Sequence, residues 1–237
     1  MEVSVCVPVY RRHAPPDVAG LAAALPGALG SREGELVVAL NGIGAQDAGV
    51  PAGVRTVALP TNLGVAPGWN AAARACAGDV LVFCNDDVQL GPGSLERLVA
   101  VLEDRPDAGV VGPVGSMWDH RRWEHDAFVR PEDGVQECDV VSGFLFAVRR
   151  ATYDAVGGFD EAYAPASWEE VDFDCAVRAQ GLRCLAVGGV DVAHEWGISA
   201  RQPPWRTVRW GGRRELLWSI HRRNRRHFLS KWDAARG

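Results

Sequence analysis

Long apolar runs, paired cysteines and lysine are all scarce in this sequence of 237 residues. No segment approaches the roughly 20 consecutive apolar residues that a membrane-spanning helix requires. Met1 leads directly into the strand-like segment Val3–Val9, so no signal peptide is indicated. The six cysteines form no CxxC pair, and several lie in apolar runs where a thiol packs as a small hydrophobe. We therefore expect a cytoplasmic protein with structural thiols.

Acidic residues are nearly absent from the end of the chain. Residues 201–231 hold ten Arg or Lys, including the only lysine, Lys231, against the single acid Glu215. Because the whole chain has a formal net charge of −5, the preceding part is strongly acidic. The basic tail lacks a recognisable nucleic-acid-reading motif, so we expect no nucleic-acid partner.

Apolar runs alternate with helical segments along the first half of the chain, which indicates βαβα organisation. An apolar content of 47% suits one globular domain with a sizeable core. Val80–Phe83 is apolar without alternation, as in a parallel strand covered on both faces. We expect an α/β fold with a Rossmann-like, mixed and mainly parallel sheet, and a nucleotide site at the carboxyl ends of its strands. The expected strands are Val3–Val9, Leu36–Leu40, Val54–Leu59 and Val80–Cys84, and the expected helices are Val18–Leu29, Pro67–Cys76 and Ser94–Glu103.

The strongest chemical signal is an acidic turn, Asn85-Asp86-Asp87, directly after the buried strand that ends at Cys84. Mg²⁺ usually takes one or two carboxylates together with substrate phosphate oxygens, and adjacent aspartates meet that need. Taken alone, such a turn is more often a solvated loop or a helix cap. The surrounding motifs therefore decide between the two interpretations.

A second acidic group, Glu169-Glu170 with Asp172, precedes the amphipathic stretch Phe173–Gly181 and falls in the first turn of the expected helix. Acids in a first turn also stabilise the helix dipole, which is the alternative explanation. His194 follows the apolar run Leu185–Val192, where a neutral imidazole is a possible metal ligand.

Glycines mark two further loops. Asn62-Leu63-Gly64 and Gly68-Trp69-Asn70 place glycine where the backbone turns tightly or approaches a ligand, and a helix N-terminus there would favour phosphate. For Trp69, core packing and ligand contact are equally good explanations. Asn41-Gly42 reads as a turn after the second strand.

These motifs, with Gly157-Gly158-Phe159-Asp160, occur in an order that resembles the family 2 glycosyltransferases of the GT-A fold, in particular rhamnosyltransferase-like bacterial members. The resemblance runs from Pro8-Val9-Tyr10 to about His194 and covers most of the chain. It implies inverting transfer of a sugar from a nucleoside diphosphate donor, with uridine or deoxythymidine diphosphate favoured. The acceptor would be a hydroxyl of a glycan, a glycolipid or a natural product, and the cofactor Mn²⁺ or Mg²⁺.

The resemblance also implies roles for individual residues. Asp87 and His194 would hold the metal, and Glu170 would be the catalytic base, with Asp172 or Glu169 as alternatives. The sequence departs from the family pattern at Leu40, where an acid is common, at Asn85, which replaces an aspartate, and at Glu170 itself, which also replaces an aspartate. The donor-binding residues would be Pro8, Tyr10, Asn41, Asn62, Gly64, Asn70, Asn85 and Asp86, and the acceptor side would hold Ser142, Gly143, Asp160 and Trp168.

We expect a catalytic domain over residues 1–200, with a nucleotide-binding half at 1–105 and an acceptor-side half at 106–200. Residues 201–237 would form a basic amphipathic extension. That extension could rest on an anionic membrane, pack on the catalytic domain, neutralise donor phosphate or form a subunit interface in a homodimer. Membrane contact would make the protein peripheral at the inner face of the membrane.

Two other functions use comparable features. A sugar nucleotidyltransferase would also combine an α/β sheet with a divalent cation, but its glycine-rich, basic first loop is missing, since Pro8-Val9-Tyr10 follows the first strand. A non-catalytic nucleotide-sugar-binding scaffold would explain the departures at Leu40, Asn85 and Glu170.

Overall fold

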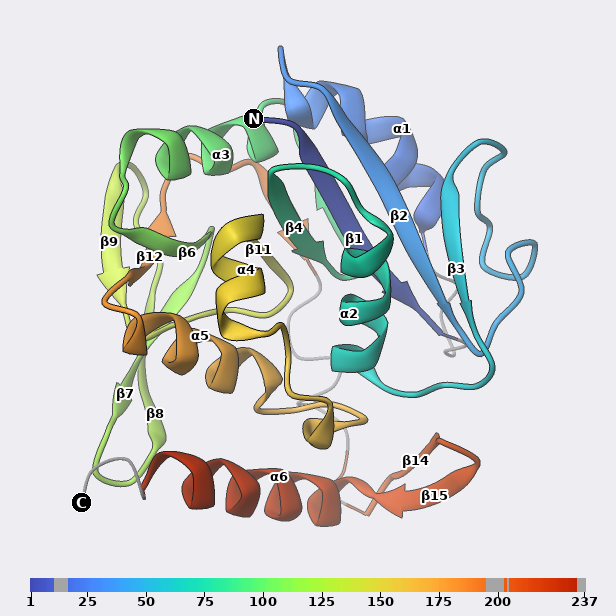
Figure 1. Ribbon diagram of the computed structural model, residues 1–237, viewed down its shortest axis with the longest axis vertical. Helices are drawn as coiled ribbons and strands as arrows, with labels where there is room; N and C mark the ends of the chain where they lie inside the picture. The colour runs from blue at the N-terminus through green and yellow to red at the C-terminus, as the bar shows by residue number, and fades with distance from the viewer. Residues whose placement is uncertain (11–16, 195–202, 204, 234–237) are drawn as a thin grey trace.

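The computed structural model describes residues 1–10, 17–194, 203 and 205–233. Within these residues, eight strands form one central sheet in which β9 and β11 run antiparallel to the other six (Figure 1). In spatial order the strands are β3 (Arg55–Leu59), β2 (Gly34–Asn41), β1 (Val3–Val9), β4 (Val80–Cys84), β11 (Leu145–Arg149), β6 (Ala108–Gly112), β12 (Arg183–Val187) and β9 (Val135–Cys138). The expected mixed, mainly parallel sheet is confirmed.

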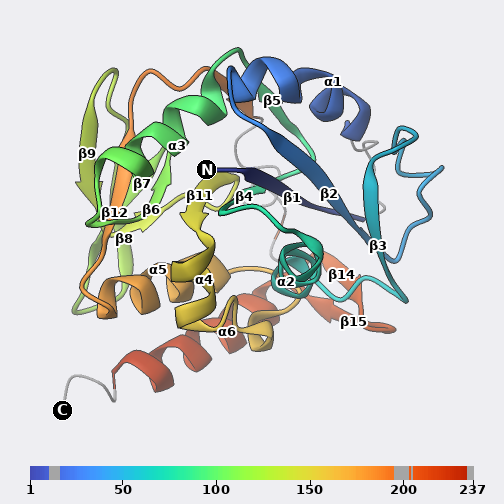
Figure 2. The same cartoon turned by 45° about the horizontal axis from the view of Figure 1, so that its top comes forward.

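Helices cover both faces of the sheet, which is why its central strands carry apolar side chains on both sides. Every residue of β1 and β4 is buried. Figure 2 shows the two helical layers, with α1 and α3 packed on one face and α2, α4 and α5 on the other. These helices are α1 (Val18–Leu29), α2 (Val65–Ala75), α3 (Ser94–Asp104), α4 (Arg150–Val156) and α5 (Glu169–Ala179).

The ends of the elements follow local chemistry. Strand β4 and helix α1 span the residues that the sequence predicts. Helix α2 begins at Val65, two residues before the predicted start, because Gly64 takes a left-handed φ of 106° and turns the chain into the helix. Helix α5 begins at Glu169, so the acids at 169, 170 and 172 do occupy a first turn.

Short strands complete the fold around the carboxyl edge of the sheet. β5 (Val88–Leu90) pairs with β13 (Val192–His194), and β7 (Gly115–Asp119) lies between β10 (Val140–Val141) and β8 (Glu124–Val129). A one-turn 3₁₀ helix, η1 (Glu161–Tyr163), precedes α5. The two cysteines nearest each other, Cys6 and Cys76, are free thiols like the other four.

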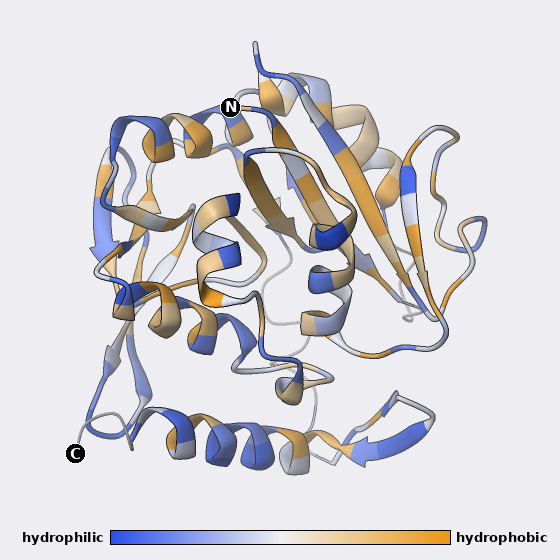
Figure 3. Cartoon of the chain, in the orientation of Figure 1, coloured by the Kyte–Doolittle hydropathy of each residue, from blue (hydrophilic) through white to orange (hydrophobic). Residues whose placement is uncertain are grey.

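The basic tail forms a hairpin, β14 (Thr207–Trp210) with β15 (Arg213–Leu216), followed by helix α6 (Leu217–Trp232). Figure 3 shows that β15 and much of α6 are hydrophilic, whereas the central strands are apolar. The inner side of α6 nevertheless joins a third apolar cluster, in which Phe228 packs with Trp123, Tyr163, Val171 and their neighbours. The tail therefore packs on the rest of the chain, which is one of the alternatives left open by the sequence.

Both expected halves contribute to one sheet, since β1 to β4 come from residues 1–105, whereas β6, β9, β11 and β12 come from residues 106–200. The expected boundary between residues 200 and 201 lies outside the described residues, so that division stays a prediction. Among the described residues, no helix is long and apolar enough to cross a membrane.

Docking of α6 predicts different effects for two aromatic residues on this helix. Phe228 is 0% exposed and Trp218 is 47% exposed. Phe228→Ala should lower the free energy of unfolding by about 3–5 kcal/mol, as expected for a buried aromatic side chain. Trp218→Ala should change it by less than about 0.5 kcal/mol. Urea unfolding of both variants measures the difference, and equal effects would show that α6 is not an integral part of the fold.

Candidate active site

The site is built where β4 ends and β11 begins. These neighbouring strands run antiparallel, with Cys84 opposite Leu145. The pairing continues one step further, because the backbone N–H of Asn85 donates to the carbonyl of Phe144 at 2.9 Å. The acidic turn Asn85–Asp87 is therefore fixed beside Ser142–Phe144, although about 60 residues separate them in the chain.

Asp87 meets His194 at this edge of the sheet. The turn leads into β5, and β13 pairs with β5 so that His194 lies opposite Val88. The His194 Nε2 and Asp87 Oδ1 atoms are 3.3 Å apart. The imidazole also stacks on the ring of Phe144, with centroids 4.6 Å apart and planes 9° from parallel, which fixes its orientation. The two predicted metal ligands are thus brought together.

The donor set fits a divalent cation. Two ligand atoms each about 2.1 Å from one ion and at right angles to each other lie about 3 Å apart. The observed 3.3 Å between Nε2 of His194 and Oδ1 of Asp87 is close to that separation. Among the described residues, no group of three or more His, Cys, Asp or Glu side chains could hold a metal. A protein that supplies two ligands leaves the other coordination positions for diphosphate oxygens and water.

Asp86 occupies a different position in the same turn. Its side chain is buried, and its carbonyl accepts from the backbone N–H of Asp17 at 3.1 Å. Asn85 is partly exposed beside it. Both predicted donor contacts therefore lie directly next to Asp87, with Asn85 the more accessible of the two.

Glu170 approaches the site from α5. Its side chain lies against the backbone of Gly143, because a Cβ added at Gly143 would lie 3.4 Å from Glu170 Cγ and 3.5 Å from its Cδ. Gly143 directly precedes Phe144, which stacks on His194. Two consecutive residues just before β11 therefore lie beside the candidate base and the candidate metal ligand.

The environment of the glutamate pair favours the protonated form. Burial, followed by the charge of Glu170, raises the pKa of Glu169 well above its ordinary value, and burial raises the pKa of Glu170. Glu169 is buried, and its Oε2 atom has no hydrogen-bond partner among the described residues. Glu170 is only partly buried, so it is the member of the pair that can reach an acceptor.

Asp172 has a structural role rather than the catalytic one considered from the sequence. It is 3% exposed and both of its oxygens are engaged. Oδ1 accepts from the Tyr163 hydroxyl at 3.1 Å and from Trp232 Nε1 at 2.7 Å, while Oδ2 accepts from Lys231 Nζ at 2.7 Å. A carboxylate with these partners anchors α6 and is not free to accept an acceptor proton.

Asp160 and Trp168, both predicted on the acceptor side, also contact helix α6 of the tail. Asp160 Oδ2 lies 2.9 Å from His227 Nε2, and its Oδ1 accepts from the N–H of Ala162. Burial acts to raise the pKa of Asp160, but the hydrogen bonds from His227 and Ala162 and the charge of Lys231 together lower it. The Trp168 ring packs on Phe228, 4.8 Å between centroids.

The predicted donor loop is held by a buried asparagine. Asn41 Nδ2 donates to the carbonyl of Gly64 at 2.8 Å, and Asn41 Oδ1 accepts from the N–H of Leu63 at 2.7 Å. Gly64 has no room for a side chain, since a Cβ there would lie 2.6 Å from Pro165 Cα. Asn62 accepts from the N–H of Gly64 and donates to the carbonyl of Arg209 in the hairpin. Asn41 and Asn62 therefore each hold the loop with both the oxygen and the nitrogen of their side-chain amides.

Asn70 belongs to the packing beneath the site. Its Oδ1 accepts from the Tyr153 hydroxyl at 2.7 Å and from the N–H of Phe159, and its Nδ2 donates to Phe159 and Glu161. Trp69 is buried among aromatic rings, so core packing is the correct explanation for it. Pro8 is buried in β1 beneath Gly68, and Tyr10 follows the end of that strand, partly exposed.

Two residues around the site, Phe144 and Asn224, are not among the site residues predicted from the sequence. The pairing of β4 with β11 reveals that the Phe144 ring stacks on His194. Asn224 had a visible signal, because it lies between Ile220 and Phe228 at a spacing of four on the buried side of α6. A lone polar residue on an apolar stripe indicates a buried hydrogen-bonding position.

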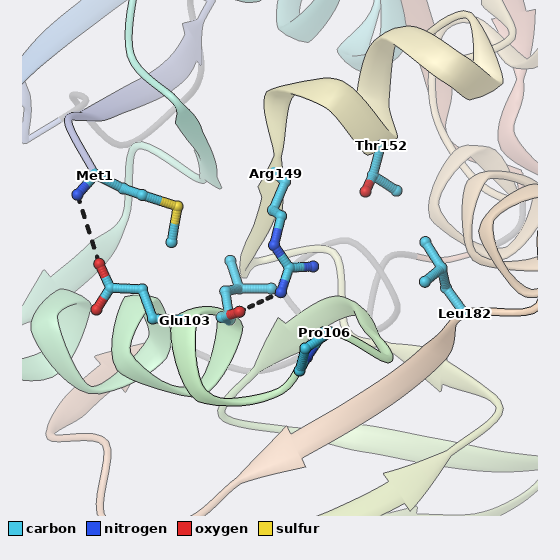
Figure 4. Close-up of a pocket in the computed structure, with 7 residues that line it drawn as sticks. Met1, Glu103, Pro106, Arg149, Thr152 and Leu182 are labelled. Carbon is cyan, nitrogen blue, oxygen red and sulfur yellow. Dashed lines mark hydrogen bonds and ion pairs between the residues drawn. The ribbon is translucent and has the colours of Figure 1, made fainter.

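A hollow elsewhere on the molecule does not belong to this site. Figure 4 shows it at the amino ends of the parallel strands, between Met1, Glu103, Arg149 and Leu182. The Arg149 guanidinium is already engaged with the carbonyls of Leu102, Arg105 and Ala108. Ligands of open α/β sheets bind at the opposite, carboxyl edge.

Sequence comparison matches the middle of the chain to a known family. The family model described as "Glycosyl transferase family 2" matches residues 45–160, which include Asp87 and end before Glu170 and His194. A relative from Mycobacterium tuberculosis, "N-acetylglucosaminyl-diphospho-decaprenol L-rhamnosyltransferase", is 27% identical over 53% of this chain and 50% of its own. The "O-antigen biosynthesis protein RfbC" of Myxococcus xanthus is 26% identical over 56% of this chain and 12% of its own. This chain thus matches at most half of the length of either relative.

Two solved structures share the fold. GalNAc-T7, crystallised with UDP, GalNAc and Mn²⁺, superposes with a TM-score of 0.75 at 13% identity, over 97% of this chain and 48% of that one. The mannosyltransferase PcManGT from Pyrobaculum calidifontis, in complex with GDP-Man and Mn²⁺, gives a TM-score of 0.57 at 17% identity, over 79% and 55%. These similarities confirm the predicted GT-A architecture.

Proposed function

We propose that this chain, which belongs to glycosyl transferase family 2, transfers a sugar from a nucleoside diphosphate donor to an acceptor hydroxyl with inversion at the anomeric carbon. One observation carries the proposal: Glu170 lies where a Cβ on Gly143 would meet it at 3.4 Å, and the next residue, Phe144, stacks on His194, both just before β11. A candidate base and a candidate metal pair thus lie around one point at the carboxyl edge of β4. Residues 1–105 would bind the nucleotide and residues 106–200 would present the acceptor.

Glu170 is the proposed general base. A sugar hydroxyl is a weak nucleophile until a positioned group accepts its proton as the new bond forms. In this step the acceptor oxygen bonds to the anomeric carbon and the hydroxyl proton passes to the Glu170 carboxylate. The bond from the anomeric carbon to the phosphate oxygen breaks, and its electron pair leaves with the nucleoside diphosphate. Attack from the side opposite the leaving group inverts the configuration.

Asp87 and His194 are the proposed ligands of Mn²⁺ or Mg²⁺. A bound cation would stabilise the charge that develops on the leaving diphosphate and would orient the donor. Asp87 immediately precedes β5 and His194 ends β13, so the β5–β13 pairing is what brings the two residues together. The Phe144 ring holds the imidazole against rotation.

The relatives suggest which substrates to test first. The mycobacterial relative is named as an L-rhamnosyltransferase for N-acetylglucosaminyl-diphospho-decaprenol, and one structural neighbour was solved with UDP. We propose a uridine or deoxythymidine diphosphate donor and an acceptor hydroxyl on a glycan, a glycolipid or a natural product. A nucleotide-binding scaffold without turnover is the competing proposal, since Asn85 and Glu170 replace the residues expected from the family resemblance.

The outer surface of the tail is suited to an anionic membrane. In the hairpin, Arg209 pairs with Arg214 and Thr207 with Leu216, and all four are exposed. Because side chains alternate along a strand, these residues share one face. The intervening residues face the body of the protein, where Trp210 is buried and Glu215 bonds Arg223 of α6.

The outer side of α6 continues this basic and aromatic surface. Trp218, Arg222 and Arg226 recur every four residues and are exposed. Trp205, in the turn before the hairpin, is 73% exposed. Among the exposed side chains of the described residues 205–233, the acidic one is Asp233, directly after α6. Arginine with interfacial aromatics favours anionic lipid headgroups, so we propose peripheral contact with such a surface, where a lipid-linked acceptor would lie.

Nucleotide binding tests the metal pair. Uridine or deoxythymidine diphosphate with Mn²⁺ should raise the melting temperature, because a ligand at 100 times its Kd stabilises the folded state by about 2.7 kcal/mol. Guanosine diphosphate serves as the comparison. The shift should require metal and disappear in Asp87→Ala, while Asp126→Ala, which changes an exposed acid on β8, should keep it. An undiminished shift in Asp87→Ala would move the metal site elsewhere.

Glu170→Gln tests the base. We expect nucleotide-dependent stabilisation to persist while kcat falls by about 100-fold or more. Because burial raises the pKa of Glu170 and only the ionised carboxylate accepts a proton, activity of the wild type should rise with pH through a value above 4.5. The pH–activity profile of the variant should lack this rise, which we call the acid limb. Glu132→Gln, an exposed glutamate, is the matched control. Full turnover in Glu170→Gln would exclude it as the base.

Vesicle binding tests the tail surface. Each arginine near an anionic bilayer contributes about 1 kcal/mol, so Arg214→Ser with Arg222→Ser should weaken binding to phosphatidylglycerol vesicles by about 30-fold. Arg121→Ser with Arg130→Ser changes the charge equally at exposed sites outside the tail. Co-sedimentation of the three proteins measures the difference. Equal binding by both double variants, or equal binding to neutral phosphatidylcholine, would contradict a tail-specific electrostatic contact.

A further inference from the structure

The chain reaches the glutamate pair through a strained turn. Ser167 and Trp168 have φ values of 83° and 78°, in the left-handed region that residues with a side chain seldom adopt. Trp168 is the N-cap of α5, and no side chain caps this helix end. Such a turn persists only where neighbouring groups hold it. Glu169 and Glu170 follow directly, so whatever holds the turn also sets the direction of the Glu170 side chain.

Asn224 of α6 supplies much of that hold. It is 0% exposed, in the middle of a helix whose neighbouring buried residues are apolar. Its Nδ2 group donates to three carbonyls of the incoming segment, those of Tyr163 at 2.5 Å, Ala166 at 2.9 Å and Ser167 at 3.0 Å. Two N–H groups are thus shared among three acceptors, the last of which belongs to a residue with left-handed φ.

The neighbouring residue of α6 completes the contact. Arg223 donates from its NH2 group to the carbonyl of Ala164, and its Nε donates to Asn224 Oδ1 at 3.1 Å. That second bond orients the Asn224 amide with its N–H groups toward the turn. The far side of the same segment is held by α2, where the N–H of Val65 donates to the carbonyl of Pro165 at 2.8 Å. The turn is therefore clamped between the tail and the donor loop.

The tail also holds the turn from beyond Glu170. Asp172 receives Lys231 Nζ and Trp232 Nε1, and its backbone N–H donates to the carbonyl of Trp168 at 2.9 Å. The Trp168 ring packs on Phe228. Contacts from α6 thus bracket Glu169 and Glu170 on both sides.

We propose that Asn224 is a positioning residue for Glu170: through the carbonyls of Tyr163, Ala166 and Ser167 it holds the left-handed turn that aims the base at the start of β11. The inference rests on the proposed role of Glu170. It assigns the basic tail a part in the transfer step that is independent of its outer, arginine-rich surface. Loss of the Asn224 amide allows the turn to relax and the Glu170 carboxylate to leave its place beside Gly143.

The test uses Asn224→Asp in the full chain, which keeps the shape of the side chain and removes both N–H donors. Nucleoside diphosphate release from UDP-glucose and dTDP-L-rhamnose with Mn²⁺ reports turnover. We expect kcat to fall by about tenfold or more, the loss of about one transition-state contact, with the KM for the donor unchanged. The acid limb of the pH profile should also move, because the environment of Glu170 changes.

Ile220→Ala is the matched control, since Ile220 is buried on the same side of α6 one turn earlier. It should lower the melting temperature without changing kcat or the acid limb. Trp232→Phe is the milder second variant, because it keeps an aromatic ring and removes only the donor to Asp172. It should reduce kcat in the same direction as Asn224→Asp. Wild-type kcat and pH profile in folded Asn224→Asp, or a loss matched by Ile220→Ala, would overturn the proposal.

Hydrogen exchange separates failure of this inference from failure of the proposed function. Backbone amides of residues 163–175 should exchange faster in Asn224→Asp than in the wild type, and Ile220→Ala should leave this segment unchanged. If residues 163–175 exchange faster in Asn224→Asp but the wild type releases no nucleoside diphosphate, transfer would be refuted. The stabilisation of the turn by Asn224 would still stand. Active wild type with unchanged exchange and kcat in Asn224→Asp would refute only the positioning role.

Discussion

The antiparallel pairing of β4 with β11 is the interaction on which the site depends. It joins the two halves of the sheet and places the end of one strand beside the beginning of the other. The acidic turn after β4 and the Gly143-Phe144 pair before β11 therefore lie side by side, although they are far apart in the sequence. Phe144 then fixes His194, and Gly143 leaves room for Glu170. A change in register of this one pair would separate the proposed metal ligands from the proposed base.

Gly143 and Gly64 mark two places where other segments pass close to the backbone near the site. A Cβ at Gly143 would be in ordinary van der Waals contact with Glu170, at 3.4 Å, so a small side chain has room there. Gly64 is the tighter position, because a Cβ there would lie 2.6 Å from Pro165 Cα. The two close approaches connect the nucleotide side of the site to the segment that leads into α5. Both the loop at Gly64 and the segment at Gly143 therefore pack on the stretch between Pro165 and Glu170.

Much of the fold follows from the sequence because it depends on local pattern. The buried strand Val80–Cys84 and the helix Val18–Leu29 are fixed by apolar runs and by their ends. The position of the acids at a strand's end and in a helix's first turn also follows from local pattern. Local pattern could not reveal that Asp160 bonds to His227 and that Asp172 accepts hydrogen bonds from Lys231 and Trp232. These partners lie about 60 residues later in the chain.

The basic tail illustrates the same limit. Its composition suggests a surface segment, and the arginines do lie mostly outside, yet Asn224 and Phe228 are among the most buried residues of the chain. A helix with one polar face and one apolar face leaves its partner undefined from sequence alone. Here the partner is the turn before α5, and three backbone carbonyls there need donors that only a neighbouring element can supply.

The contacts between α6 and the turn before α5 also bear on the stability of the fold. A carboxyl group whose pKa is raised in the folded state is ionised at a cost, so folding loses stability as pH rises from the ordinary value of 4.5 toward the folded pKa. Glu169 and Glu170 therefore weaken the fold near neutral pH, at a turn that already contains two left-handed residues. The contacts of α6 offset both penalties because they involve a buried carboxylate and carbonyls that would otherwise lack donors. A glutamate pair of raised pKa next to a strained turn thus requires a second element packed behind it, and helix α6 is that element.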